Sequence, residues 1–206
     1  MTRREILKRY LLFIVCLFFM GLGVALTKHG DLGVSPISSV ANVVSIRFTF
    51  FSFGTWLTIS NCVLLVGQIL LLRKNFKPFR LMQIPLSFLF GYFTDFGLWL
   101  AGNIPNDAYI VQLLLVLSGI AVLGFGITLG VIADVILNSG EAFVKALACV
   151  TKKDFGNVKI AFDVSWVLLF IVLSMLFFDG KLYGTREGTI ISALALTTLF
   201  DTIRHF

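Results

Sequence analysis

The amino-acid sequence predicts an all-α membrane protein with six transmembrane helices and two re-entrant half-helices, built from two inverted three-span repeats. Its 206 residues are 58% hydrophobic and only 14% charged. A soluble domain of this size has too small an interior to bury so much apolar surface. The apolar residues also gather in segments of about 20, the length that a bilayer demands. The third observation is a pattern that returns about halfway along the chain.

Six apolar segments are long enough to span a membrane. They cover about residues 10–28, 54–72, 84–101, 109–133, 160–178 and 188–203. The N-terminal segment has a basic start, a long apolar run and no small-residue cleavage site, so we expect it to be retained as the first helix. Gly21 and Gly23 in this segment predict close packing against another helix, within the chain or in a homodimer.

The stretch between the first two spans is too polar and too short to cross a bilayer alone. Ser35 is a good N-cap residue, and Pro36 suits the first position of a helix. Arg47 would then lie at the negative end of the helix dipole. We therefore expect a half-helix over residues 35–47 that enters the membrane without spanning it.

The second half of the chain repeats this order. Gly124 and Gly126 echo Gly21 and Gly23 at an offset of 103 residues. Residues 139–151 occupy the half-helix position, with Asn138 or Ser139 as the cap. The chain thus divides into repeats 1–103 and 104–206 within one membrane domain.

Each repeat has three spans, an odd number, so the second repeat must lie upside down relative to the first. The half-helices would enter from opposite faces, and their N-terminal ends would approach each other near the middle of the membrane. Inverted repeats with broken helices at their interface are typical of secondary transporters.

The net charge of +6 indicates orientation and not nucleic-acid binding. The basic residues cluster before the first span, between the second and third, and between the fourth and fifth. Because such clusters favour the cytoplasmic side, both termini are predicted to be cytoplasmic. The clusters comprise Arg3, Arg4, Lys8, Arg9, Arg73, Lys74, Lys77, Arg80, Lys152, Lys153 and Lys159.

The run Asp31-Leu32-Gly33-Val34-Ser35-Pro36 before a short helix, with the matching Asn138-Ser139-Gly140, resembles the YczE/YyaS/YitT group of bacterial membrane proteins. The chain is most similar to the YczE-like members, over essentially its full length. The resemblance implies a six-span protein of the bacterial plasma membrane and supports the fold more than any particular substrate.

The two half-helix N-termini are the predicted substrate site. The first N–H groups of a helix lack partners within the helix, so they attract anions. Capping alone is the alternative explanation for serine and asparagine at these positions. The candidate binding residues are Ser35, Pro36, Ser38, Ser39, Asn138, Ser139, Gly140 and Glu141.

Polar residues within apolar segments are candidates for proton or sodium coupling, because such residues usually face a bundle interior or a water-filled cavity. They are Asn61, Asp95, Asp134 and Asp163. Asp134 could instead be a partner for Lys145.

The depth of two of these aspartates in the membrane can also be predicted. Asp95 is expected well below the membrane surface on the inner side. Asp163, like Asp201, could instead lie solvated near a cytoplasmic helix end. Glu141 could pair with Lys145 at i, i+4, or simply stabilise the first turn of its own helix.

No enzyme is expected, because the chain carries none of the common catalytic motifs, and His29 and His205 are predicted at opposite faces. Cys16, Cys62 and Cys149 lack metal-site spacing, so no metal or cofactor is expected. The sequence thus predicts a secondary transporter of a small anionic or zwitterionic solute, with the bilayer and that solute as partners. The alternatives are a substrate-binding subunit of a multicomponent transporter and a non-transporting membrane helper.

Overall fold

The chain folds into long apolar helices and two short ones. The computed structural model describes residues 3–133 and 135–178. Within them lie, in chain order, α1 (Arg3–His29), α2 (Pro36–Arg47), α3 (Phe53–Leu72), η1 (Arg73–Asn75), η2 (Pro78–Met82), α4 (Gln83–Ala101), α5 (Tyr109–Ala133), α6 (Ser139–Thr151) and α7 (Phe155–Phe177).

Five helical segments in the described part of the chain are long and apolar enough to cross a membrane. They are Arg4–His29, Phe53–Asn75, Pro78–Ala101, Tyr109–Ala133 and Phe155–Phe177. This composition is typical of a multi-pass membrane protein. The predicted sixth span, residues 188–203, lies outside the described residues.

The last described helix begins earlier than predicted. Asp154 caps α7, since its carboxylate accepts a hydrogen bond from the Gly156 N–H at 2.8 Å. The helix therefore starts at Phe155 and not at residue 160. As a consequence, Lys159 belongs to α7 and is buried; its assignment to a loop between spans was wrong.

The two short helices lie where the sequence predicts half-helices. Helix α2 carries Pro36 at its start and Arg47 in its last turn. Helix α6 is capped by the Asn138 side chain, which accepts from the Ser139 N–H at 2.8 Å. Neither helix is long enough to cross a bilayer, which requires about 20 residues.

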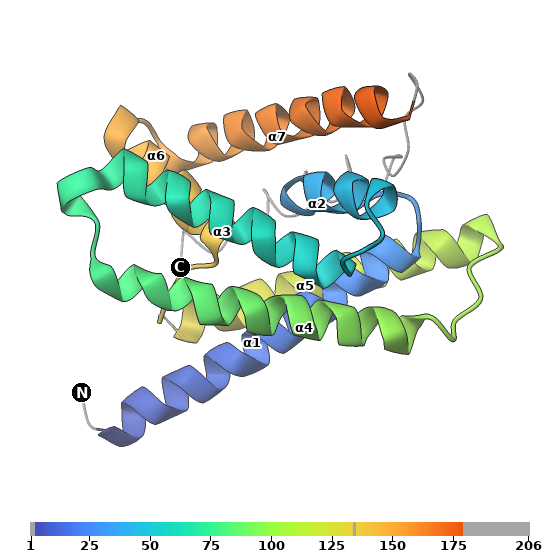
Figure 1. Cartoon of the computed structure of the whole chain (residues 1–206). Helices are drawn as coiled ribbons and strands as arrows, with labels where there is room; N and C mark the ends of the chain where they lie inside the picture. Colours follow the sequence, from blue (N-terminus) through green and yellow to red (C-terminus); the bar gives the residue numbers. More distant parts are fainter. Residues whose placement is uncertain (1–2, 134, 179–206) are drawn as a thin grey trace.

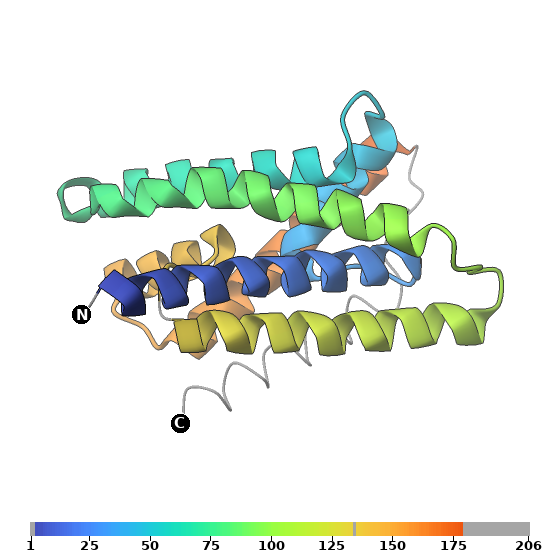
Figure 2. The same ribbon diagram turned by 90° about the horizontal axis from the view of Figure 1, so that it is seen from below.

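Both short helices pack against the same two long ones. Helix α2 contacts α3 and α7, and α6 contacts α3 and α7 as well. Helices α3 and α7 run in opposite directions, and so do α1 and α5, which lie side by side (Figures 1 and 2). Exchanging α1, α2 and α3 for α5, α6 and α7 thus maps the contacts of α2 with α3 and α7 onto those of α6 with α7 and α3; α4 has no such counterpart among the described residues.

The two ends of the helical assembly differ in character (Figure 1). One end holds the beginning of α1 and the α3–α4 and α6–α7 connections, where most of the described basic residues lie. The opposite end carries an aromatic cluster, in which Trp56 contacts the rings of Phe48, Phe50 and Phe51. Phe177 at the end of α7 packs on Phe48 with ring centroids 5.6 Å apart.

Helices α1 and α5 meet backbone to backbone through glycines. A Cβ atom added at Gly23 would lie 2.7 Å from the Gly119 carbonyl oxygen, and one at Gly119 would lie 2.8 Å from the Gly23 carbonyl oxygen. Neither backbone can move away without separating the helices. The predicted close packing of the glycine-rich spans therefore occurs within the chain; a homodimer stays a prediction.

We expect Gly119→Val to lower the thermal stability of the detergent-purified protein, with a free-energy cost of about 1–3 kcal/mol as for other overpacked interiors. Gly102→Val is the control, because a Cβ there comes no closer than 3.3 Å to its neighbours. Equal melting temperatures for both variants would contradict the proposed contact.

Candidate functional site

The N-terminal turns of α2 and α6 touch each other. A Cβ atom added at Gly140 would lie 2.7 Å from Cδ1 of Ile37, so the Ile37 side chain packs directly against this glycine. Trp166 of α7 fixes the same turn, since its Nε1–H donates to the Ile37 carbonyl oxygen at 3.1 Å. The two short helices therefore converge with their positive ends, as the sequence predicts.

A small cavity of about 50 Å³ lies at this convergence. Its walls come from α1 to α7 and from the residues just before α2 and α6. Apolar side chains such as Met20, Phe90 and Leu123 form one part of the wall. The polar part consists of Ser35, Ser38, Asn61, Asn138, Glu141, Lys159 and Asp163.

Asn61, which lines this cavity, carries a hydrogen-bond donor without a partner. The residue is 1% exposed, and its Nδ2 is the only buried side-chain nitrogen or oxygen in the described part of the chain without a hydrogen-bond partner. An unsatisfied buried donor costs about 1–3 kcal/mol. Such a cost is expected to be recovered when a ligand or water supplies an acceptor.

A buried ion pair forms another polar part of the wall. Lys159 Nζ lies 2.6 Å from both carboxylate oxygens of Asp163, one turn further along α7. The two side chains are only 7% and 9% exposed. The alternative that Asp163 is solvated at a helix end is therefore wrong, because the helix begins earlier and buries both residues.

Lys159 is the site residue that the sequence analysis missed. Its i, i+4 spacing to Asp163 was the available signal, since oppositely charged side chains at this spacing share a helix face. The predicted span, residues 160–178, begins one residue after Lys159 and so leaves it in the loop.

Glu141 stabilises the start of its own helix. Its carboxylate lies near the backbone N–H of Asn138, three residues earlier, as in a capping box. It is also close enough to Lys159 and Asp163 to interact with both charges. It forms no ion pair with Lys145, which is exposed and lines a different cavity.

Of the three candidate serines in and before α2, Ser35 and Ser38 line the cavity and Ser39 does not. Ser35 Oγ donates to Ser38 Oγ at 3.0 Å, so the α2 N-cap makes no side-chain hydrogen bond to the helix backbone. Ser39 is fully buried elsewhere and donates to the Pro36 carbonyl oxygen at 2.6 Å.

On the α6 side, Ser139 lies behind the cavity. Its hydroxyl is 3.4 Å from Ser87 Oγ, and its carbonyl oxygen accepts from Gln68 Nε2 at 3.2 Å. Gly140 does not line the cavity but packs against Ile37. The predicted set is thus brought together in part, with Pro36, Ser35, Ser38, Asn138 and Glu141 lining the cavity.

Asp95 does not reach the cavity. Its carboxylate accepts from Ser52 Oγ at 2.5 Å and from the Gly54 N–H at 2.8 Å. It therefore holds the start of α3 against α4, at the aromatic end of the molecule and not the basic end. Asp95 lies in the second half of α4. The expectation that this position is on the inner side of the membrane stays a prediction. Asp134 and Asp201 lie outside the described residues.

The described helices define a multi-pass helical membrane protein with a polar cavity among them. Residues 7–205 match a family described as a family of unknown function (DUF6198), and the chain belongs to that family. No curated protein and no solved structure matches the chain.

We expect Lys159→Met to cost about 3 kcal/mol or more of unfolding free energy, because it leaves the Asp163 carboxylate buried without its partner. The double variant Lys159→Met, Asp163→Leu should recover most of that loss, since it removes both charges. Thermal unfolding in detergent measures both variants. Equal stability of the single variant and the wild type would show that the ion pair is not buried.

We expect Asp95→Asn to lower the free energy of unfolding by about 1–2 kcal/mol, because charge-assisted hydrogen bonds to Ser52 and Gly54 are replaced by neutral ones. Ligand binding at the cavity should stay unchanged, as Asp95 does not line it. A selective loss of binding with normal stability would contradict this structural role.

Proposed function

We propose that the protein is a secondary transporter of a small anionic or zwitterionic solute across the bacterial plasma membrane. The solute binds in the central cavity between the N-termini of α2 and α6. The single observation that carries the proposal is the unpartnered Nδ2 of Asn61, a residue that lines that cavity. A buried donor of this kind can pair with an acceptor oxygen of a bound solute or of water.

The surrounding groups favour a solute with a negative charge. Two helix N-termini converge here, and α2 has no side-chain cap of its own. Lys159 adds a positive charge, while Asp163 and Glu141 offer acceptors for an ammonium group. Both carboxylic acids and amino acids of small size match this combination.

The arrangement of the helices supports alternating access. Matched contacts of α2 and α6 with α3 and α7, and opposite directions of α3 and α7, are what two inverted repeats would produce (Figure 1). Secondary transporters of this design rock one repeat against the other around a midplane site. The concentration of basic residues at one end supports a cytoplasmic position for that end.

The small size of the cavity is what a closed conformation of the transporter would show. A volume of about 50 Å³ holds little more than one or two water molecules. A larger solute therefore requires the two helix tips to separate. The contact between Gly140 and Ile37 would break when the N-terminal ends of α2 and α6 separate.

The test is Asn61→Leu, which replaces the unpaired donor by an apolar group of similar size. The free protein should be as stable as the wild type or more stable by about 1 kcal/mol, because an unsatisfied polar group is removed. Thermal stabilisation by a panel of acetate, lactate, glycine, alanine and taurine should be present in the wild type and lost in the variant.

Any compound that stabilises the wild type is then tested for uptake into proteoliposomes. Cys62→Ala, one residue along α3, is the matched control and should retain both binding and uptake, because Cys62 does not line the cavity. Unchanged binding and uptake in Asn61→Leu would refute the proposed site.

A further inference from the structure

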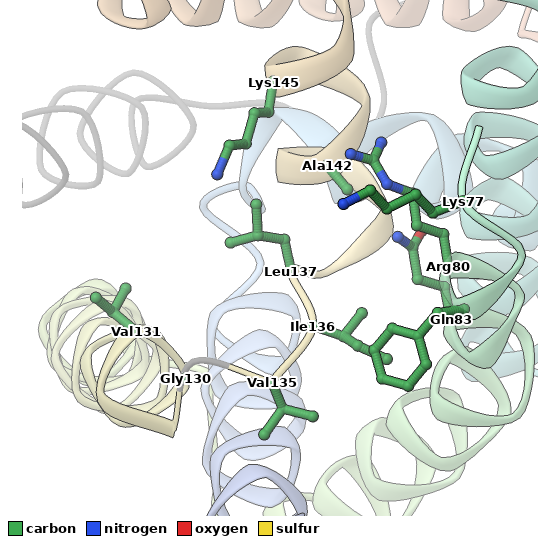
Figure 3. A pocket seen from close by; sticks show the side chains of 11 residues that line it. Lys77, Arg80, Gln83, Gly130, Val131, Val135, Ile136, Leu137, Ala142 and Lys145 are labelled. Carbon is green, nitrogen blue, oxygen red and sulfur yellow. The ribbon is translucent and has the colours of Figure 1, made fainter. Parts of the chain in front are cut away.

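A second, larger cavity opens at the basic end of the molecule. It has a volume of about 410 Å³, which is within the usual size of small-molecule sites. Its walls are the α3–α4 connection, the end of α5, the segment before α6 and the first turns of α6 (Figure 3). We call it the basic groove.

Three cationic side chains line the basic groove. They are Lys77 before η2, Arg80 in η2 and Lys145 in α6. Among residues 3–133 and 135–178, no carboxylate lines it and none of the three cations forms an ion pair. Within this part of the chain, the gathered like charges create a positive potential that attracts an anion.

Local structure explains why Lys77 and Arg80 act together. Pro78 starts a 3₁₀ turn, in which the Arg80 N–H donates to the Lys77 carbonyl oxygen at 2.9 Å. Side chains at i and i+3 of such a turn lie on the same side. Figure 3 shows both reaching toward Ala142 in the first turn of α6.

Hydrogen bonds through Gln68 connect the two walls of the basic groove, which are the start of α4 and the start of α6. Gln68 Nε2 donates to Gln83 Oε1 at 3.1 Å and to the Ser139 carbonyl oxygen at 3.2 Å. Both glutamines are buried, at 0% and 3% exposure. The start of α4, beside Lys77 and Arg80, is thereby held against the start of α6, which carries Lys145.

We propose that the basic groove binds a phosphate group. A carboxylate offers two oxygens, whereas a phosphate offers enough oxygens to accept from three cations on different segments. The Arg80 guanidinium can bind two of these oxygens at once, and each lysine provides a point charge. The inference goes beyond the proposed function, because it does not require the central cavity to carry a solute.

The phosphate can come from solution or from a phospholipid headgroup. Basic pockets at the cytoplasmic ends of membrane helices commonly accept anionic headgroups. A dissolved phosphate would instead be poised near the central cavity, since Ile136 and Leu137 line both the basic groove and a smaller cavity that reaches Asn138 and Glu141.

The test uses the full chain and two sources of phosphate. Inorganic phosphate is titrated into delipidated protein in detergent, and nanodiscs of phosphatidylglycerol are compared with nanodiscs of phosphatidylcholine. Thermal unfolding is measured in each case. We expect phosphate, phosphatidylglycerol or both to raise the melting temperature of the wild type.

The triple variant Lys77→Gln, Arg80→Gln, Lys145→Gln should weaken that response by at least about tenfold in concentration, because its charge-assisted hydrogen bonds are lost. The control Lys74→Gln, Lys152→Gln, Lys153→Gln removes the same charge from exposed residues outside the groove and should respond like the wild type. If the triple variant does not fold, Lys145→Gln alone is compared with Lys152→Gln.

A response to phosphate alone identifies a dissolved ligand, and a response to phosphatidylglycerol alone identifies a headgroup. The proposal is overturned if neither source stabilises the wild type, or if groove and control variants respond alike. These outcomes are independent of Asn61→Leu, which tests the central cavity and leaves the basic groove intact.

Discussion

The contact between the first turns of α2 and α6 is the constraint on which the rest of the site depends. The Ile37 side chain fills the space that Gly140 leaves open, and Trp166 holds the Ile37 carbonyl oxygen. Two helix N-termini, each positive, are thereby brought together in an apolar surrounding. The nearby carboxylates of Glu141 and Asp163 offset part of this positive charge.

Polar groups in the centre of an apolar bundle are costly, so their pairing is informative. Lys159 and Asp163 satisfy each other, and Glu141 supports the helix that carries it. Asn61 Nδ2 stands apart, because a buried amide donor without an acceptor destabilises the free protein. The cavity thus combines paired charges with one amide donor that has no partner in the protein.

Local patterns in the sequence were sufficient to predict much of the fold. Pro36 predicted the start of α2 because proline suits the first position of a helix, although Ser35 makes no capping hydrogen bond. The run from Asn138 to Glu141 predicted the start of α6 because capping depends on a few neighbouring residues. The start of α7 was misplaced for a physical reason: hydropathy marks apolar length, whereas Asp154 begins the helix through a hydrogen bond. That error assigned Lys159 to a loop.

The sequence by itself determined the helical class, the apolar spans and the two short polar helices, since these follow from composition and from interactions between neighbours in the chain. Only the tertiary structure decided which polar residues meet. It brought Asn61, Lys159 and Glu141 to one cavity, and it assigned Asp95 to the start of α3. Such contacts join residues far apart in sequence, and helix packing, which periodicity does not encode, selects them.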